Sequence, residues 1–404
     1  MKWEKVKLGD ICKYVTSGGT PKSSIKEYYE PKQIPWLKTK EVNYCRIYET
    51  ESYISKDGLD NSSAKMIPQN SVIVAMYGQG DTAGRVAINK IPLTTNQACC
   101  NLIIDETKAY YEFVYYQLVT LYEKMVSLKN GGAQPNLNAA IIKSIEIKLP
   151  PLKTQRYIAD ILSAYDDLIE NNQKQIKLLE EAAQRLYKEW FVNLRFPGHE
   201  NTKIVDGVPE GWRVASIVDI CDTVGGGTPS TKIQSYYEKG DILWVTPTDI
   251  TRNFSLALLD TEKKITPEGL KNSSAKMLPA ETILMTSRAS VGFFGMCKYE
   301  VCTNQGFISC IPKRENLQMY LLFNLKSRVE EIRQKAGGST YLEISKTVFR
   351  ELKIILPKDE VLAEYQKNVH DIFDEIYCRT EMIKSLVDMR NRVLPKLMSG
   401  EVEV

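Results

Sequence analysis

The chain has 404 residues, of which 43% are hydrophobic and 25% charged, so its composition is that of a globular protein and excludes wholesale disorder. Lysine and arginine number 53 against 50 aspartates and glutamates, and the net charge of +3 excludes a uniformly basic nucleic-acid binder, although not a locally basic one. Only two histidines are present, which argues against a histidine metal cluster or a histidine-dependent triad.

The cysteine and hydropathy patterns predict a cytoplasmic protein. Nine cysteines include no C-x-x-C pair, which is typical of reduced thiols in a cytosolic chain. The N-terminal residues are charged and lack a signal-peptide apolar region. No apolar run approaches the roughly 18 residues that span a bilayer, so we expect no membrane partner.

In chain order, the first segment mixes short strands with turns and a helix. Alternating apolar residues predict strands over 71–76 and 145–149, and residues 110–128 are predicted to be helical. The second half of the chain has strands predicted over 282–285 and 352–356 and a helix over 318–335. Both segments are therefore predicted to be strand-rich α+β domains, over residues 1–150 and 208–356.

Each α+β domain is followed by a segment that is predicted to form one long helix, over residues 151–195 and 357–404. Apolar residues alternate at spacings of four and three, as in a heptad seam, and the two seams align at a constant offset. We expect the helices to pair as an antiparallel coiled coil with an internal pseudo-two-fold, each a rod of roughly 57 Å. The alternative is that each helix packs only on its own domain. The predicted seam comprises Ile158, Leu162, Tyr165, Ile169, Asn172, Ile176, Leu179, Val369, Phe373, Ile376, Thr380, Ile383, Val387 and Arg390.

Internal similarity shows that the two halves are copies. Residues 17–21 (Ser-Gly-Gly-Thr-Pro) match 225–229, residues 61–68 (Asn-Ser-Ser-Ala-Lys-Met-Ile-Pro) match 272–279, and residues 95–97 (Thr-Asn-Gln) match 303–305. The matches are collinear, so the chain contains a duplicated domain. We expect the glycines of the first motif to permit tight turns or positive φ angles.

Catalytic motifs are missing from the sequence. We find no phosphate-binding G-x-x-x-x-G-K-[ST] loop, no H-E-x-x-H and no G-x-S-x-G, and residues 225–228 lack the Rossmann glycine spacing. The chain is therefore predicted to be non-catalytic. The α+β segments are mildly basic and the helical segments mildly acidic. This asymmetry suits domains that face a polyanion, and it equally suits solvated coiled-coil helices that are rich in acidic residues.

This organisation resembles the DNA-specificity subunit of Type I restriction-modification enzymes. The motifs that carry the resemblance are the two Gly-Thr-Pro and Thr-Asn-Gln elements, residues 34–36 and 242–244, residues 149–155 (Leu-Pro-Pro-Leu-Lys-Thr-Gln), Trp190-Phe191 and residues 394–402. One departure is the start of the second helix at 356–359, which lacks the second proline and has no clear glutamine at the matching place.

The resemblance implies that each α+β domain is a target-recognition domain for one half of a bipartite double-stranded DNA target, with the helices as the spacer. It also implies two methyltransferase subunits and restriction subunits as partners. S-adenosylmethionine, ATP and Mg²⁺ would bind those partners, and this chain would hold no cofactor or metal. A stand-alone methyltransferase or nuclease, and a coiled-coil interaction protein without a DNA role, are the alternatives.

Loop residues with hydrogen-bonding side chains are the candidates for base readout. Solvated loop residues without a DNA role are the alternative interpretation of each. The loops differ between the copies, notably residues 77–80 against 287–290, so we expect two different half-sites. The candidates are Lys38, Thr39, Lys40, Gln79 and Arg85 in the first domain, and Thr246, Thr248, Asp249, Arg288 and Ser290 in the second.

Overall fold

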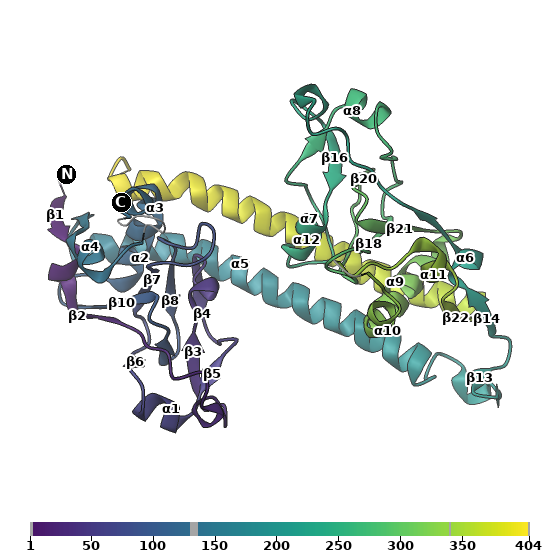
Figure 1. The fold of residues 1–404 in the computed structure, drawn as a ribbon, viewed down its shortest axis with the longest axis horizontal. Coiled ribbons are helices and arrows are strands. Elements are labelled where there is room, and N and C mark those ends of the chain that lie inside the picture. The colour runs from purple at the N-terminus through teal and green to yellow at the C-terminus, as the bar shows by residue number, and fades with distance from the viewer. Residues whose placement is uncertain (1–2, 130–135, 339–340, 403–404) are drawn as a thin grey trace. The chain divides into compact units, whose positions relative to one another are not determined.

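A computed structural model of the chain describes residues 3–129, 136–338 and 341–402. It divides into two compact units (Figure 1). Unit 1 joins Met1–Asp167 to Leu386–Val404, and unit 2 is Leu168–Ser385. The long helices α5 (Leu152–Tyr187) and α12 (Asp359–Ser399) each contribute one segment to each unit.

Unit 1 is built on a five-stranded sheet and a four-stranded sheet. The five-stranded sheet has the order β2 (Cys12–Ser17), β10 (Cys99–Ile104), β7 (Val72–Ala75), β8 (Val86–Asn89), β4 (Cys45–Ile47). The four-stranded sheet has the order β5 (Tyr53–Ile54), β3 (Ile34–Leu37), β9 (Leu93–Thr95), β6 (Met66–Ile67). A separate pair joins β1 (Glu4–Lys7) to β11 (Glu146–Leu149). The pairs β4–β8 and β3–β9 are parallel and the others antiparallel.

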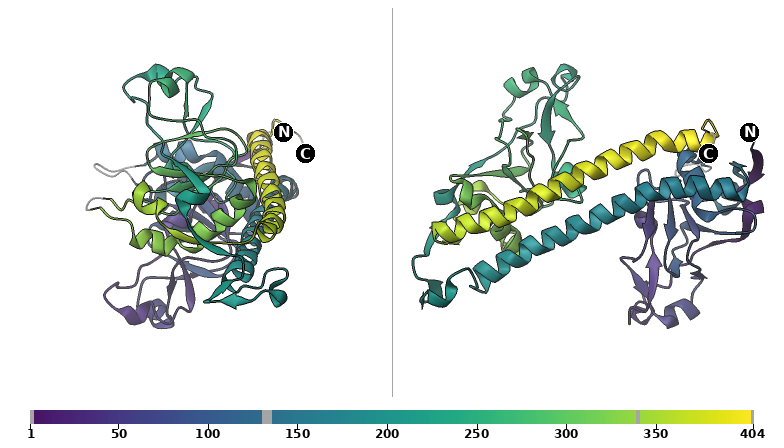
Figure 2. Two further views of the ribbon diagram at one scale, coloured as in Figure 1. Left: turned by 90° about the vertical axis from the view of Figure 1, so that its right-hand side faces the viewer. Right: turned by 180° about the vertical axis from the view of Figure 1, so that it is seen from behind.

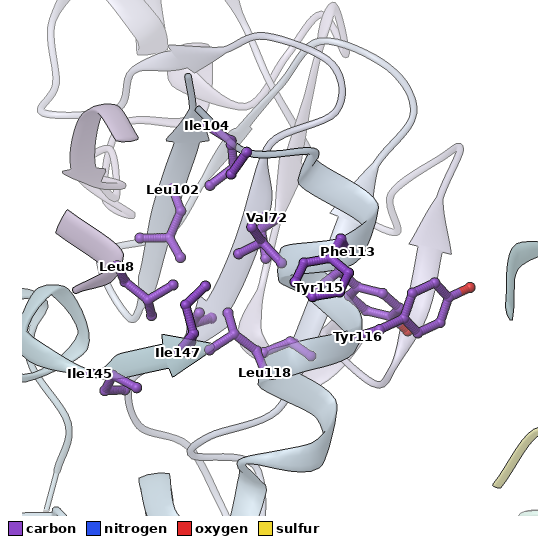
Figure 3. Close-up of a cluster of buried hydrophobic side chains, with 14 of the residues drawn as sticks. Leu8, Val72, Leu102, Ile104, Phe113, Tyr115, Tyr116, Leu118, Ile145 and Ile147 are labelled. Atoms are coloured by element: carbon purple, nitrogen blue, oxygen red, sulfur yellow. The ribbon is translucent and has the colours of Figure 1, made fainter. Parts of the chain in front are cut away.

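Both faces of the central strands β10, β7 and β8 are buried, which explains why β7 and β10 are almost wholly apolar. On one face Val72 and Leu102 pack with Phe113 and Leu118 of α2 (Tyr111–Thr120), as Figure 3 shows. The opposite face places Ile73 in a second core. Because neighbouring residues of a strand point to opposite faces, these runs can fill two cores at once.

Unit 2 repeats this arrangement with shorter strands. One sheet has the order β15 (Cys221–Val224), β21 (Phe307–Pro312), β18 (Ile283–Thr286), β19 (Phe294–Gly295), and another β17 (Lys264–Ile265), β16 (Ile242–Val245), β20 (Cys302–Thr303). Two further pairs join β14 (Arg213–Ser216) to β22 (Lys353–Leu356) and β12 (Ile204–Val205) to β13 (Val208–Pro209). The β16–β20 pair is parallel, as is its counterpart β3–β9.

The remaining helices are short. In unit 1 they are α1 (Lys56–Asp60), α3 (Tyr122–Ser127) and α4 (Ala139–Ser144). In unit 2 they are α6 (Ile217–Ile220), α7 (Pro247–Thr251), α8 (Pro267–Lys271), α9 (Gln318–Ser327), α10 (Val329–Gln334) and α11 (Lys346–Arg350). In the described ranges, no helix combines the length and the apolarity needed to cross a bilayer.

The helices predicted over 110–128 and 318–335 are each broken once, into α2 and α3 and into α9 and α10. The first break, at Leu121, brings the Tyr122 ring edge-on to Tyr44 and lets its hydroxyl donate to the Asp81 carbonyl. At the second, the Arg328 guanidinium donates to Glu331 and to the Lys353 carbonyl. Contacts with other parts of the domain therefore override the continuous helical pattern.

Segments of α5 and α12 lie side by side within each unit, running antiparallel (Figure 2). In unit 2 the Arg379 guanidinium donates to Asn172 Oδ1 at 3.1 Å, and the Tyr365 hydroxyl lies 3.5 Å from the Ala183 carbonyl oxygen. In unit 1, Ile158 and Leu394 belong to one buried cluster. Coiled-coil packing along the full helices and an internal pseudo-two-fold stay predictions.

Most of the predicted seam is buried. The buried positions are Ile158, Leu162, Ile169, Asn172, Ile176, Val369, Phe373, Ile376, Thr380 and Ile383, and the partly buried ones are Tyr165, Leu179, Val387 and Arg390. Asp166, one residue beyond the predicted position at Tyr165, is buried instead. The buried stripe therefore departs locally from strict heptad spacing.

The two polar interruptions of the seam both have partners. Arg390 forms an ion pair with Asp166 at 2.5 Å, and Asp166 also accepts the Tyr116 hydroxyl at 2.5 Å. Asn172 donates to the Leu168 carbonyl at 2.8 Å and accepts from Arg379. Both interrupting side chains, Asn172 and Arg390, therefore have polar partners.

The missing glutamine at the start of the second helix is present further along, at Gln366. Gln155 of α5 accepts a hydrogen bond from the Tyr110 amide at 2.8 Å, just before α2. Gln366 of α12 accepts from the Met319 amide at 2.9 Å, in the first turn of α9. The expectation that the second helix lacks this glutamine was wrong. The glutamine lies further from the preceding proline in α12 than it does in α5.

Candidate nucleic-acid interface

The Thr-Asn-Gln turn of unit 1 is held between the Gly-Gly-Thr segment and the end of β3. The Gly19 amide donates to the Thr95 carbonyl at 2.9 Å, and the Asn96 amide donates to the Leu37 carbonyl at 2.9 Å. The Trp36 indole donates to the Gly19 carbonyl at 3.0 Å. We call this arrangement the turn frame.

The glycines of the turn frame are required because other backbone segments approach them closely. A Cβ on Gly18 would lie 2.1 Å from the Thr95 carbonyl oxygen, and one on Gly19 would lie 2.3 Å from the Ala64 amide nitrogen. Neither residue has a positive φ. Of the two expected roles, a tight turn or a positive φ angle, the second does not apply to Gly18 and Gly19. These residues are glycine because another backbone occupies the space that a Cβ would need.

Unit 2 contains the same frame. The Gly227 amide donates to the Thr303 carbonyl at 2.9 Å, and the Asn304 amide donates to the Val245 carbonyl at 3.0 Å. The Trp244 indole donates to the Gly227 carbonyl at 3.0 Å, as Trp36 does in unit 1. The two copies thus retain one geometry.

A hydroxyl–amide contact closes each frame on its exposed side. The Thr20 hydroxyl donates to Gln97 Oε1, and the Thr228 hydroxyl donates to Gln305 Oε1. All four side chains belong to exposed residues. Because the amide oxygen is used, the NH₂ group of each glutamine is left as the outward donor.

The loops that carry the predicted base readers converge on this frame. In unit 1, Lys38 directly follows Leu37, and the loop after β7 is anchored by the Met76 amide, which donates to the Ala98 carbonyl at 2.8 Å. In unit 2 the loop after β18 is anchored in the same way, by the Ser287 amide and the Gly306 carbonyl at 2.8 Å. The structure therefore brings candidates from separate parts of the sequence to one edge of each domain.

The unit 1 candidates differ in how accessible they are. Lys38 is half-buried with its ammonium 4.9 Å from the centre of the Trp36 ring, and Thr39 is buried. Lys40 is exposed and pairs with Glu51, whose carboxylate raises the pKa of Lys40 through a hydrogen bond. These three side chains thus span the range from buried to exposed.

The loop between β7 and β8 carries the other two unit 1 candidates. Gln79 is exposed. Arg85 donates to Asn43 at 2.9 Å and to Asp81 at 2.5 Å, and the hydrogen bond to Asp81 raises the pKa of Arg85. Arg85 is therefore held by Asp81 of the same loop and by Asn43, whereas Gln79 is open to solvent.

In unit 2, Thr246 and Asp249 form a helix cap. Asp249 Oδ2 accepts from the Thr246 amide at 2.7 Å and from its hydroxyl at 2.6 Å, and Oδ1 accepts from the Glu262 amide at 2.8 Å. Glu41 does the same in unit 1, accepting from the Lys38 amide at 3.1 Å. The sequence reasoning missed this role, although an acidic residue three positions after an N-cap signals it.

The remaining unit 2 candidates are exposed. Arg288 lies 3.7 Å from Glu343 and 6.0 Å from the centre of the Tyr341 ring. Ser290 is in the same loop, and its amide donates to the Arg288 carbonyl at 2.8 Å. Thr248 is exposed in α7 and lines a hollow of about 350 Å³ whose other wall is α12.

One group of possible metal ligands occurs among the described residues. His370 lies between Glu281, 3.0 Å from Nε2, and Asp374, 3.3 Å from Nδ1. The Lys298 ammonium lies 2.6 Å from Asp374, so a cation already neutralises this carboxylate.

The chain matches the family of the Type I restriction modification DNA specificity domain twice, over residues 1–181 and 209–387, and it belongs to that family. It is 29% identical over 422 residues to the Type I restriction enzyme MjaIX specificity subunit of Methanocaldococcus jannaschii, covering 100% of this chain and 94% of that one. It is 24% identical to the HindI specificity subunit of Haemophilus influenzae, covering 99% of each.

The fold is also known from a solved structure. The S subunit of the Type I restriction-modification system from M. genitalium superposes with a TM-score of 0.60 at 17% identity, covering 98% of this chain and 96% of that one. The chain is thus a DNA-specificity subunit with two target-recognition domains, and it is non-catalytic, as specificity subunits are.

Proposed function

We propose that each target-recognition domain reads one half of a bipartite double-stranded DNA target through the loops around its turn frame. The observation that carries the proposal is that the frame is the same in both domains while the loops differ. The Gly84 amide donates to the Ala75 carbonyl in unit 1, and the Gly292 amide donates to the Thr286 carbonyl in unit 2. These equivalent hydrogen bonds close the loops after β7 and β18, and the loop in unit 2 is the shorter one. A fixed frame with variable loops suits two domains that read different base sequences.

The exposed candidates are the ones available for base edges. Gln79 offers an amide of the kind that pairs with adenine, and Arg288 offers the fork that pairs with guanine in the major groove. Lys40, Thr248 and Ser290 are exposed as well. Thr39, Thr246, Arg85 and Asp249 support the loops in the free chain, so we assign them to positioning the readers.

We further propose that two methyltransferase subunits and, in the complete enzyme, restriction subunits assemble on this chain in the cytoplasm. Support comes from large apolar side chains that the long helices expose on their outer faces: Tyr157, Leu168 and Leu178 of α5, and Met382 and Met389 of α12. Exposed apolar side chains suit a protein interface where they gather into one patch. S-adenosylmethionine, ATP and Mg²⁺ would bind to those partners, and this chain would carry neither cofactor nor metal.

The decisive experiment is to sequence the methylated bases in a host that expresses the complete methyltransferase with single loop variants. Arg288→Ala should relax one base of the half-site read by unit 2, since a bidentate contact discriminates by about 1–3 kcal/mol. The other half-site should stay unchanged. Gln79→Ala is the matched variant and should relax only the half-site read by unit 1.

Two outcomes would contradict the proposal. One is that either variant relaxes both half-sites, which would mean that the domains do not read separately. The other is that both variants methylate the wild-type motif at the wild-type stringency, which would place base readout outside these loops.

A further inference from the structure

The longest stretch of identity between the two domains is only partly explained by their fold. In residues 61–68 and 272–279, Asn61 and Asn272 each donate to a carbonyl four residues earlier, at 3.0 Å. Ala64 and Ala275 are buried, and their amides donate to the serine hydroxyls two residues earlier, Ser62 and Ser273, at 3.2 Å. These positions are identical because the turn requires them.

Lys65 and Lys276 have no such internal role. Both are exposed, and among the described residues neither forms an ion pair or a side-chain hydrogen bond. Exposed positions nearby have diverged between the copies, since Asp60 of α1 corresponds to Lys271 of α8. An exposed lysine that stays the same in two diverged domains indicates a ligand that both domains share.

The turn frame fixes where these lysines lie. A Cβ on Gly19 would meet the backbone of Ser63 at 2.2 Å and that of Ala64 at 2.3 Å, so residues 63–65 lie directly against the frame. In unit 2 a Cβ on Gly227 would meet the Ala275 amide nitrogen at 2.4 Å. Each lysine is therefore next to the frame around which the base-reading loops gather.

Charge distinguishes these lysines from the loop cations Lys40, Arg85 and Arg288. Lys40, Arg85 and Arg288 each have a carboxylate neighbour in the free chain. Lys65 and Lys276 have none among the described residues, so their charges are available to a phosphate without breaking an ion pair. Backbone phosphates are common to any two half-sites, whereas base edges are not.

We propose that Lys65 and Lys276 bind backbone phosphates, one at each half-site, and set the affinity and register of DNA binding without contributing to its sequence. This inference rests on the proposed function of the two domains. The DNA-binding surface of each domain then has two parts, a phosphate contact that both domains share and loops that differ between them. The frame holds both parts at a fixed spacing.

The test measures the salt dependence of DNA binding by the full chain assembled with its methyltransferase subunits, on a target duplex and on a scrambled duplex. Each phosphate contact contributes about 0.9 to the slope of log affinity against log salt, so Lys65→Gln with Lys276→Gln should lower the slope by about 1.8 on both duplexes. Between 50 and 200 mM salt, the advantage of the wild type should shrink about twelvefold. The methylated motif should not change.

The control is Lys271→Gln, an exposed lysine whose counterpart is acidic, and it should leave the slope near the wild-type value. Lys65→Arg should retain the slope, because the charge is kept. The inference is overturned if the double variant behaves as the control does, if its methylated motif changes, or if it loses its methyltransferase subunits while the slope is unchanged. If the wild type shows no preference for the target duplex, the proposed function itself fails.

Discussion

Replacing Arg390 by leucine should loosen the contact between α5 and α12 in unit 1, because it removes the ion-pair partner of a buried carboxylate. Arg390 Nη1 lies 2.5 Å from Asp166 Oδ1, and the side chains are 21% and 11% exposed. Leucine is a natural choice for this position, since Leu179 occupies the aligned position of the first helix. After the change, the Tyr116 hydroxyl still donates to Asp166.

The magnitude follows from the burial of the pair. Breaking a fully buried ion pair costs about 3–5 kcal/mol, and an exposed one is worth about 0.2–1 kcal/mol. The exposures of Arg390 and Asp166 lie between those of a fully buried and an exposed ion pair, so we expect the contact to lose about 2 kcal/mol of stability. At 1.4 kcal/mol per factor of ten, protected amides in this contact should exchange roughly 30-fold faster.

Hydrogen exchange followed by mass spectrometry measures this locally, in peptides that cover residues 152–167 and 386–399. The control is Arg392→Leu on the same helix, at an exposed position, which should change little. Replacing the whole network, as Asp166→Leu with Arg390→Leu and Tyr116→Phe, should recover most of the protection, since no buried polar group is then left unpaired. The reasoning is refuted if Arg390→Leu exchanges like the control, or if the triple variant is as unprotected as the single one.

Two further variants test the frame and the loops. Gly227→Ala should lower the free energy of unfolding of unit 2 by about 1–3 kcal/mol in urea denaturation, because the new Cβ would lie 2.2 Å from Ser274 Oγ. The control is Gly337→Ala, which has open space around it and should have little effect. Equal losses of stability in the two variants would disprove the argument. Glu51→Gln frees the Lys40 ammonium and should raise affinity for non-specific DNA in fluorescence anisotropy by up to about fivefold, the worth of a surface ion pair, whereas weaker binding would contradict it.

The sequence established the duplicated organisation because its signals are local and occur twice. Strands over 71–76 and 282–285 follow from short apolar runs, and β7 and β18 lie there. The heptad spacing predicted two long helices, and α5 and α12 cover them. The Gly-Thr-Pro and Thr-Asn-Gln motifs likewise indicate the family from the sequence alone.

The candidate site was only partly predictable. The residue types and loops could be chosen from the sequence, but not which side chains are free. Asp249 looks like a base reader in the sequence, yet both its oxygens accept hydrogen bonds within its own domain. Lys65 looks like an ordinary solvated lysine until the frame beside it is seen.

Periodicity, composition and repeated motifs are properties of the order of residues along the chain, so the sequence alone determined the two domains, their helices and the family. Tertiary structure decided the pairings between residues far apart in the chain: Arg390 with Asp166, Gln366 with the start of α9, and Gly19 with the backbone of Ala64. Such contacts depend on how elements pack in three dimensions, and a one-residue drift in a helix is enough to replace Tyr165 by Asp166 at the buried face.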